Sequence, residues 1–210
     1  EHAGQGASKF LDELLIWREL SHNLCFHRVE LEQLSVLPEW AQQTLHEHAS
    51  DPRPVQYDQE TLARSQTDDR LWNLAQTSLR IHGELHNNLR MTWAKALLPW
   101  RSSMQASLET AIEFNHRYAL DGSDANSYGG LLWAFGLFDR PFEERPIHGT
   151  VRSRSTKAHA KRLDMERYAA RIQKPSAQRQ CIAVIGAGIA GLSAARTLQD
   201  QGHQVQLFEK

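Results

Sequence analysis

A short segment near the C-terminus places the tightest restriction on the fold of this 210-residue chain. The apolar residues 181–185 are followed by three glycines in a GxGxxG arrangement, Gly186, Gly188 and Gly191, and then by a helical pattern. A second apolar run follows and ends at Glu209. Strand, glycine turn, helix, strand and acid occur in this order in the βαβ units that bind dinucleotides. The pattern therefore predicts that a Rossmann-like α/β domain begins near residue 181.

Each glycine of this segment has a physical role in such a unit. Gly186 permits the tight turn, Gly188 lets a pyrophosphate approach the backbone, and Gly191 allows the helix to pack closely against the strand. The N-terminus of the helix offers free N–H groups to the phosphates. Glu209 would accept hydrogen bonds from ribose hydroxyls. A chance glycine turn is the alternative, but the complete strand, helix and strand context favours a binding site.

The rest of the chain has the spacing of helices, and its most informative stretch is residues 72–100. We expect one unbroken helix between residues 82 and 98, with one face formed by residues that recur every three or four positions: His86, Arg90, Trp93, Leu97 and Trp100.

Such an aromatic face is either ordinary core or the wall of a ligand pocket. Burying Arg90 among Trp72, Trp93 and Trp100 would cost several kcal/mol unless a carboxylate or a ligand meets it. The stretch therefore predicts an anionic or polar partner for this guanidinium.

Composition restricts the class of protein. A 40% hydrophobic and 23% charged chain with a net charge of −1 is typical of a globular protein without a global basic signature. Cys25 and Cys181 lack metal-ligand spacing, and no apolar run is long enough to span a bilayer. We expect a monomeric cytoplasmic protein with no metal site and no membrane contact. Both ends, at Glu1 and Lys210, are expected to be cut from a longer protein.

These patterns predict a mainly α chain with three parts. Residues 1–173 are expected to form a helical domain, residues 174–180 a linker, and residues 181–210 the first βαβ unit of an incomplete Rossmann-like domain. The segment IAVIGAGIAGLSAARTLQDQGHQVQLFEK resembles the N-terminal fingerprint of FAD-dependent oxidoreductases of the amine-oxidase or renalase-like type. The resemblance implies that this unit binds FAD in preference to NAD(P).

The helical part resembles a different family. FLDELLIWRELSHNLCF, DDRLWNLAQ, HGELHNNLRMTWAK, FNHRYALDGSDANSYGGLLWAFG and ERPIHGTVR occur in the order of the helical FAD domain of class II DNA photolyases. The resemblance implies light-driven electron transfer from reduced FAD to a cyclobutane pyrimidine dimer that is flipped out of damaged DNA.

The same resemblance implies roles for residues near the flavin. Arg90 and Asp121 match an ion pair beside the isoalloxazine ring. Asn115 matches an asparagine near flavin N5, with Asn126 as the alternative.

It also implies an electron relay and a lesion pocket. Trp93 and Trp72 match the proximal and distal tryptophans that pass electrons to the flavin, and Trp100 an additional aromatic near them. In the lesion pocket, Glu13 matches a glutamate that binds the dimer bases, and Trp17 and Trp133 match tryptophans that line the pocket. Met91 matches a methionine packed beside it, and Asn87 resembles a substrate-contacting asparagine of class I relatives.

Two other functions remain open on these residues. A cryptochrome-like blue-light receptor would share the fold and FAD but would not repair DNA. Alternatively, an amine-oxidase-like oxidoreductase could carry a degenerate photolyase part. The basic residues that either contact DNA phosphates or form a solvated face are Arg145, Arg152, Arg154, Lys157, Lys161 and Arg162.

Overall fold

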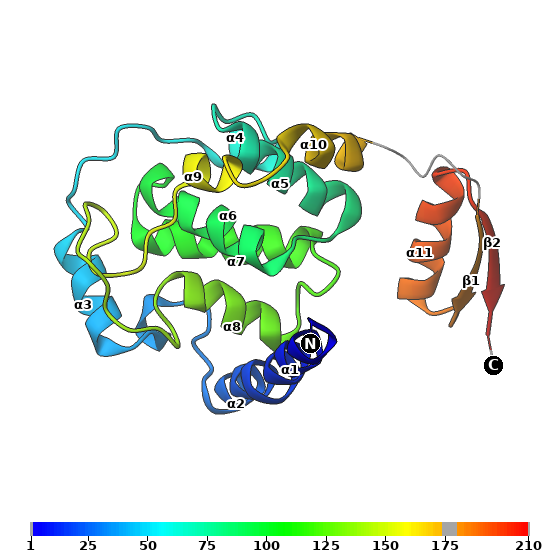
Figure 1. Ribbon diagram of the computed structural model, residues 1–210, viewed down its shortest axis with the longest axis horizontal. Helices are drawn as coiled ribbons and strands as arrows, with labels where there is room; N and C mark the ends of the chain where they lie inside the picture. Colours follow the sequence, from blue (N-terminus) through cyan, green and yellow to red (C-terminus); the bar gives the residue numbers. More distant parts are fainter. Residues whose placement is uncertain (1, 174–179, 210) are drawn as a thin grey trace. The chain divides into compact units, whose positions relative to one another are not determined.

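The structure, a computed structural model, describes residues 2–173 and 180–209. The chain divides into two compact units, Glu1–Tyr168 and Ala169–Lys210. Figure 1 shows helices throughout residues 2–173, and one helix beside two strands in residues 181–208. The predicted fold class, mainly α followed by a Rossmann-like βαβ unit, is confirmed. Residues 174–179 of the predicted linker lie outside the described residues.

Residues 2–173 contain short and medium helices. In chain order they are α1 (His2–Asp12), the π-helical η1 (Glu13–Trp17), α2 (Arg18–His27), the 3₁₀ turn η2 (Leu34–Val36), α3 (Glu39–Glu47), α4 (Gln59–Ala63), α5 (Arg70–His82), α6 (Asn87–Trp100), α7 (Met104–Tyr118), α8 (Ala125–Ala134), α9 (Thr156–Ala160) and α10 (Met165–Gln173). Over the described residues, none of these helices combines the length and the apolar character needed to cross a membrane.

Short polar side chains fix where several helices begin. The Asp58 carboxylate accepts a hydrogen bond from the Thr61 N–H at the start of α4, and Asp69 accepts one from the Trp72 N–H at the start of α5. Ser103 caps α7 in the same way. Each cap satisfies an N–H that the helix itself leaves unpaired. The cap on α5 therefore sets the position of Trp72.

The predicted continuous helix between residues 82 and 98 is wrong. Helix α5 ends at His82, because Gly83 adopts a left-handed conformation with φ of 65° and its N–H bonds the Leu79 carbonyl. A glycine in this conformation is a common helix C-cap. Helix α6 begins afresh at Asn87, where the His86 side chain accepts a hydrogen bond from the Asn88 N–H. The apolar spacing continues across this break, which hid it in the sequence.

Helix α6 forms the centre of the core. Residues 91–98 of this helix are all buried, and α5, α7 and α8 pack against it. The largest fully buried side chains of the unit are Trp72, Trp93, Phe114 and Phe135. Because a side chain in the middle of a close-packed core has little freedom, α6 holds its functional groups rigidly.

The first helical segment is interrupted where two predicted site residues lie. The π-helical segment η1 separates α1 from α2, with Glu13 as its first residue and Trp17 as its last. Single π-helical turns inside α-helices are frequent at functional sites, because the extra residue turns side chains out of the regular α-helical pattern. The segment thereby orients both residues.

The second unit is a single βαβ motif. Strands β1 (Cys181–Ile185) and β2 (Gln204–Phe208) are parallel, with Cys181 opposite Gln204 and Ile185 opposite Phe208. Helix α11 (Ile189–Asp200) connects the two strands. This is the crossover that joins parallel neighbours in dinucleotide-binding folds.

Candidate functional site

A cavity of about 420 Å³ opens between the N-terminal helices, α6 and α8, and we call it the central cavity. Seven of the predicted site residues line it: Glu13, Trp17, Asn87, Arg90, Asp121, Asn126 and Trp133. They come from parts of the chain that are more than a hundred residues apart in sequence. The structure therefore brings together most of the residues expected near the flavin and the lesion.

Two tryptophans form one aromatic wall of the central cavity. The ring centroids of Trp17 and Trp133 are 4.4 Å apart, and the rings are tilted by 31°. Gly129 makes this approach possible, because a Cβ there would lie 2.1 Å from the Ser21 hydroxyl on α2. The close packing of α2 against α8 thus produces a wall on which a flat, apolar ligand can stack.

The C-terminal end of α8 is held from the core. The ammonium of Lys95, buried on α6, donates a hydrogen bond of 2.7 Å to the carbonyl of Ala134, the last residue of α8. Burial lowers the pKa of Lys95 to about 7. Since Trp133 immediately precedes Ala134, this bond helps to fix the aromatic wall relative to α6.

A charged pair lies in the same cavity. The two terminal nitrogens of Arg90 donate to the two carboxylate oxygens of Asp121 at 2.9 and 3.0 Å. The Arg90 side chain is 13% exposed and that of Asp121 is 47% exposed. Bidentate pairs of this kind are among the stronger polar contacts in proteins. Asp121 is the partner that the sequence required for this arginine.

The location of Arg90 differs from the expectation in one respect. It does not lie among Trp72, Trp93 and Trp100, but faces the central cavity with Trp17. Residues three positions apart on an α-helix differ in direction by about 60°, and this difference is enough for Arg90 and Trp93 to meet different neighbours. Arg90 and Trp93 therefore face different surroundings from the same helix, α6.

Asn115 is connected to the charged pair through a serine. Its side chain is fully buried on α7 and donates to the Ser127 hydroxyl at 3.0 Å, and Ser127 donates to the Asp121 carbonyl at 2.5 Å. Asn115 Oδ1 and Arg90 Nε are both buried without a hydrogen-bond partner among the described residues. Unpaired buried polar atoms cost free energy and point to a missing partner.

The remaining predicted cavity residues are placed as follows. Glu13 forms an exposed ion pair of 2.6 Å with Lys9. Asn126 bonds to the Asp124 carboxylate that caps α8. Met91 is packed in the core at 8% exposure and does not line the central cavity. The structure thus gives Asn87, Glu13 and Asn126 access to a ligand in the cavity, but not Met91.

The three predicted relay tryptophans form a continuous array. Trp72 and Trp93 are stacked with ring centroids 6.2 Å apart, and Trp72 and Trp100 meet edge to face at 5.5 Å. Trp93 Nε1 donates to the Gln76 side chain at 2.9 Å. Trp72 and Trp93 are 1% exposed, whereas Trp100 is partly exposed. The array therefore leads from the core toward the surface.

Sequence reasoning missed a fourth member of this array. The ring of Tyr57 meets Trp100 edge to face at 5.3 Å, and its hydroxyl donates to the Asp68 carboxylate at 3.1 Å. Burial raises the pKa of this phenol. Tyr57 precedes the Asp58 cap of α4, and no periodicity in the sequence connects it with Trp100.

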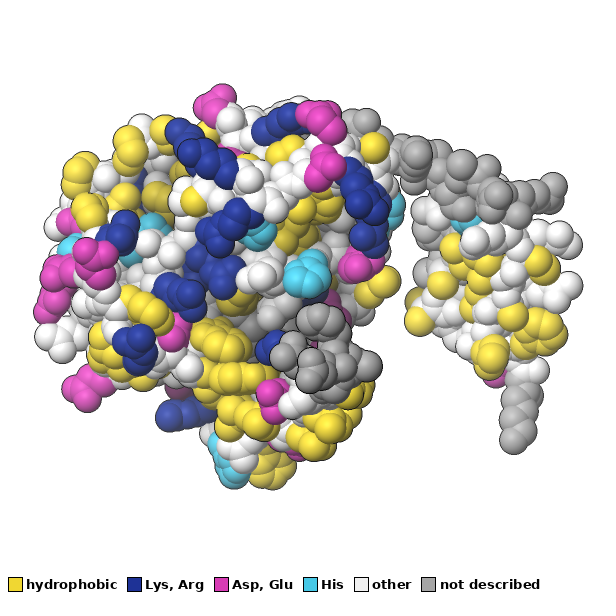
Figure 2. Space-filling view, viewed as in Figure 1, with side chains coloured by type: hydrophobic (Ala, Val, Ile, Leu, Met, Phe, Trp, Pro, Cys, Tyr) yellow, Lys and Arg dark blue, Asp and Glu magenta, His cyan; other side chains and the backbone are white. Residues whose placement is uncertain are grey.

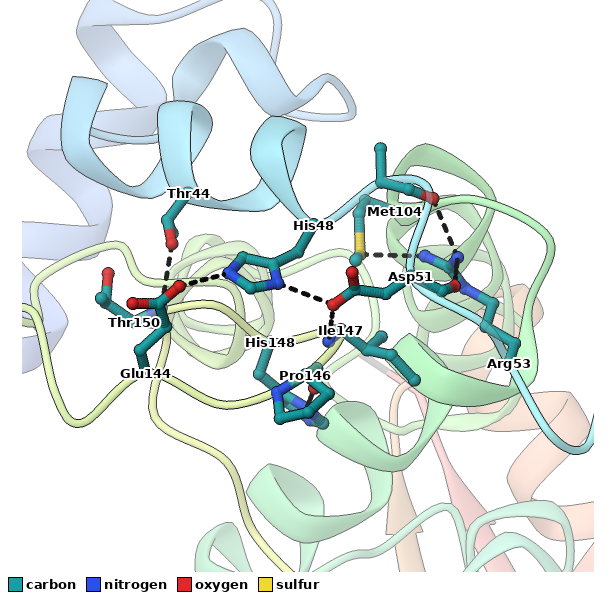
Figure 3. Close-up of polar contacts among 11 residues, drawn as sticks. Thr44, His48, Asp51, Arg53, Met104, Glu144, Pro146, Ile147, His148 and Thr150 are labelled. Carbon is teal, nitrogen blue, oxygen red and sulfur yellow. Dashed lines mark hydrogen bonds and ion pairs between the residues drawn. The ribbon is translucent and has the colours of Figure 1, made fainter.

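A histidine absent from the predictions anchors the loop that follows α8. Figure 3 shows His48, at the C-terminal end of α3, between Asp51 and Glu144. Its two ring nitrogens lie 2.6 Å from Asp51 and 3.0 Å from Glu144. Asp51 also accepts a hydrogen bond of 2.7 Å from the Ile147 N–H. The hydrogen bond to Asp51 is the main cause that raises the pKa of His48.

The glycines of the second unit have the expected geometry. Gly186 has a φ of 101°, which favours glycine. A Cβ at Gly191 would lie 1.8 Å from the Gly186 carbonyl oxygen, whereas a Cβ at Gly188 would meet nothing within 4 Å. Gly191 therefore serves packing, and Gly188 leaves open space at the start of α11. Glu209 accepts a hydrogen bond from the Ala187 N–H.

Fold and site together define a class of architecture. A helical unit with an aromatic-walled cavity and a tryptophan array is followed in one chain by a βαβ unit of the dinucleotide-binding kind. Residues 184–210 match the family described as NAD(P)-binding Rossmann-like domain.

The helical unit is similar to particular enzymes. The chain is 37% identical over 170 residues to the deoxyribodipyrimidine photo-lyase of Oryza sativa subsp. japonica, which covers 80% of this chain and 34% of that protein. It is 38% identical over 165 residues to the enzyme of the same name from Methanothermobacter thermautotrophicus, and the match covers 79% of this chain and 37% of that protein. It is also 38% identical over 166 residues to the one from Potorous tridactylus, and that match covers 79% of this chain and 31% of that protein. The chain spans about a third of the length of these curated relatives. Similarity to photolyases and to dinucleotide-binding domains is confirmed.

Proposed function

We propose that the helical unit is the FAD-binding catalytic part of a class II photolyase, which repairs cyclobutane pyrimidine dimers in DNA with the energy of light. The observation that carries this proposal is the central cavity, where the Arg90–Asp121 pair and the wall of Trp17 and Trp133 line one space. The ion pair would bind the ring of a flavin, and the aromatic wall would stack against a flipped dimer. The similarity to photolyases over 80% of the chain supports the same function.

The residues present fit a flavin. Asn115 Oδ1 and Arg90 Nε are buried polar atoms that lack partners in the described chain, and polar edges of an isoalloxazine ring would satisfy such atoms. Asp121 keeps the guanidinium oriented and neutralised. A bound reduced FAD would supply the light-driven electron transfer that splits the dimer, and Arg90, Asp121 and Asn115 are the residues that would hold its ring.

The substrate in this proposal is a dimer extruded from duplex DNA. Extrusion costs less for a dimer than for a normal pair, because damaged bases stack and pair poorly. The rings of Trp17 and Trp133 would replace part of the lost stacking, which is worth about 1–3 kcal/mol per base. Glu13 and Asn87, both at the cavity, are polar groups that can bind the base edges. A pure light sensor has no need for these groups.

The tryptophan array would pass electrons from a donor outside the protein to the flavin, which repair requires in its reduced form. Electrons move between aromatic rings in contact, so Trp93, Trp72 and Trp100 provide a route from the protein surface to the core. The exposed end of the route is extended by Tyr57. This role is separate from that of the cavity residues, and each can be tested without the other.

A binding experiment tests the lesion pocket. The affinity of the protein for a duplex with one dimer is compared with that for the undamaged duplex. Trp17→Ala should reduce this preference about tenfold or more. Phe26→Ala removes an aromatic side chain that is 84% exposed outside the cavity, and it should change nothing. Equal binding of the two duplexes by the unaltered protein would overturn the proposal.

For the C-terminal unit we propose the start of an FAD-dependent oxidoreductase domain of the amine-oxidase type. Support comes from the parallel βαβ geometry, the open space at Gly188 and the acid at the end of β2. FAD is preferred to NAD(P) because of the resemblance of residues 182–210. Titration of the protein with each dinucleotide tests this choice, and tighter binding of NAD(P) would contradict it.

A further inference from the structure

The turn that follows α8 returns a further aromatic side chain to the central cavity. Residues 131–138 are buried except for Trp133 and Phe138, and both of these line the cavity. Figure 2 shows hydrophobic side chains gathered on the surface over α8 and the N-terminal helices. This pattern of exposure singles out Phe138, which sequence reasoning missed, as an aromatic group of the cavity in addition to Trp17 and Trp133.

The backbone of Phe138 has an unusual conformation. Its φ is 59°, in the left-handed region that a bulky side chain rarely adopts. Such a conformation costs free energy and persists only where the surrounding structure enforces it, which is most common at sites that bind ligands. The strain therefore indicates that the position of this ring at the cavity matters.

Hydrogen bonds and close packing enforce the turn. The Leu137 N–H donates to the Leu132 carbonyl at 3.1 Å, and the Gly136 N–H donates to the Trp133 carbonyl at 3.1 Å. Gly136 itself has a φ of 115°, and a Cβ there would lie only 2.8 Å from the Ala41 Cβ on α3. The turn is thus pressed against α3 and has little freedom to relax.

Lys95 holds the same turn from the side of α6. Its buried ammonium donates to the carbonyl of Ala134 at 2.7 Å, and a cation at the C-terminal end of a helix also interacts favourably with the helix dipole. Burial lowers the pKa of Lys95, and the charge of Asp139, one residue beyond Phe138, partly offsets this effect. The ammonium therefore interacts with the turn both before and after Phe138.

We propose that the turn after α8 is a lesion-recognition element, in which Phe138 contacts the flipped pyrimidine dimer and Lys95 is the positioning residue that holds Phe138 in place. The dimer is taken to enter the central cavity, and in this respect the inference rests on the proposed function. An aromatic ring suits the task, since it replaces stacking that the extruded bases have lost. Lys95 is 3% exposed and does not line the cavity, so it acts through the turn and not on the DNA.

The first experiment measures the preference of the protein for a duplex with one dimer over the undamaged duplex. Phe138→Ala should lower this preference about tenfold and leave the affinity for flavin unchanged. Phe138→Leu, which keeps apolar volume without the flat ring, should lower the preference as well, and thermal unfolding shows whether each variant is folded. Phe142→Ala is the matched control, because Phe142 is a partly buried aromatic residue of the same loop that does not line the cavity. It should leave the preference unchanged.

The second experiment tests the positioning role of Lys95. Lys95→Met keeps most of the length of the side chain but removes the ammonium, so the Ala134 carbonyl loses its partner. The preference for the dimer should fall about threefold, as for the loss of one hydrogen bond. Ser107→Ala is the control, because it removes another buried hydrogen bond to α6, from the Ser107 hydroxyl to the Leu97 carbonyl. It should leave the preference unchanged whatever it does to the thermal midpoint.

Combined variants separate positioning from general loss of stability. Lys95→Met should lower the preference about threefold in the Phe142→Ala background but clearly less in the Phe138→Ala background, because the contact that Lys95 positions is already gone. Equal factors in the two backgrounds would overturn the role of Lys95.

Two further outcomes would overturn the role of Phe138. One is a preference that Phe138→Ala and Phe138→Leu retain in full. The other is weaker flavin binding by Phe138→Ala with an unchanged preference, which would assign the ring to the flavin. Equal binding of both duplexes by the unaltered protein would overturn the proposed function and the recognition element together. Discrimination that survives the loss of Phe138 would overturn the recognition element alone.

Discussion

Trp72 and Trp93 are stacked with ring planes 9° apart, and Trp72 Nε1 donates a hydrogen bond of 3.0 Å to the Trp93 carbonyl. The two indoles come from different helices, α5 and α6, and this bond fixes their relative position. Ring contact in a buried environment suits electron transfer, and it also suits ordinary packing. Photochemistry distinguishes the two roles better than stability does.

Trp93→Phe should slow photoreduction of the flavin strongly and leave dimer splitting by already reduced protein nearly unchanged. Unfolding free energy should fall by about 1–3 kcal/mol, because Gln76 loses its partner in the core. Phe114→Leu, another buried aromatic outside the array, is the control for packing. Transient absorption measures the photoreduction. If both variants slow photoreduction equally, or if Trp93→Phe loses FAD, the tryptophan array serves only to pack the core.

Asp121→Asn should weaken flavin binding by about tenfold, which corresponds to about 1.4 kcal/mol. The amide would face the Arg90 guanidinium with a donor where the carboxylate has an acceptor. Asp124→Asn is a matched control in the same loop, because asparagine caps a helix as well as aspartate does. Flavin fluorescence titration measures both. Equal affinities for the two variants would contradict a role of the Arg90–Asp121 pair.

The contact between His48 and Asp51 should make stability depend on pH. The folded pKa of His48 is raised above 6.5, so its contribution is complete below that pH and is lost as the pH rises through the folded pKa. Hydrogen bonds from the Ile147 N–H and from His48 lower the folded pKa of Asp51 below 3.8, so its contribution is complete above pH 3.8 and is lost as the pH falls through the folded pKa. The pair should therefore stabilise the loop most between these limits.

His48→Gln tests this dependence. Urea unfolding at about pH 6 and about pH 9 should show a loss of stability with rising pH in the unaltered protein, and a smaller loss in the variant. His46→Gln, an exposed histidine of the same helix, should behave like the unaltered protein. If His48→Gln retains the full dependence on pH, the loop is not anchored in this way.

Two glycines of the βαβ unit should respond differently to alanine. Gly191→Ala should unfold or distort this unit, because its Cβ would overlap the Gly186 carbonyl. Gly188→Ala should leave the unit folded, since no atom lies within 4 Å, but should reduce dinucleotide affinity. Circular dichroism and dinucleotide titration measure the two effects. Normal dinucleotide binding by Gly188→Ala would place the phosphates elsewhere.

Local sequence signals predicted much of this structure. The βαβ unit could be read residue by residue, because Gly186 and Gly191 each satisfy a requirement of the nearby backbone. Resemblance supplied the pairing of Arg90 with Asp121, which lie 31 positions apart. The break at Gly83 was missed because apolar spacing continues through it.

Contacts between distant segments were also missed. Tyr57 meets Trp100, and His48 meets Glu144 across 96 positions, without any shared periodicity. Such pairs depend on how the helices pack, which spacing along the chain does not encode. For the same reason, spacing along the chain did not indicate that Met91 lies in the core and outside the central cavity.

Loss of cyclobutane dimers from DNA under light tests the central claim most directly. The protein is loaded with FAD, reduced chemically and mixed with a duplex that contains one dimer, and samples are kept in blue light or in the dark. We predict that the dimer disappears in the light and persists in the dark, and that Trp17→Ala slows the loss. Reduced protein that binds the duplex but leaves the dimer intact in the light would contradict the account and would favour a light receptor.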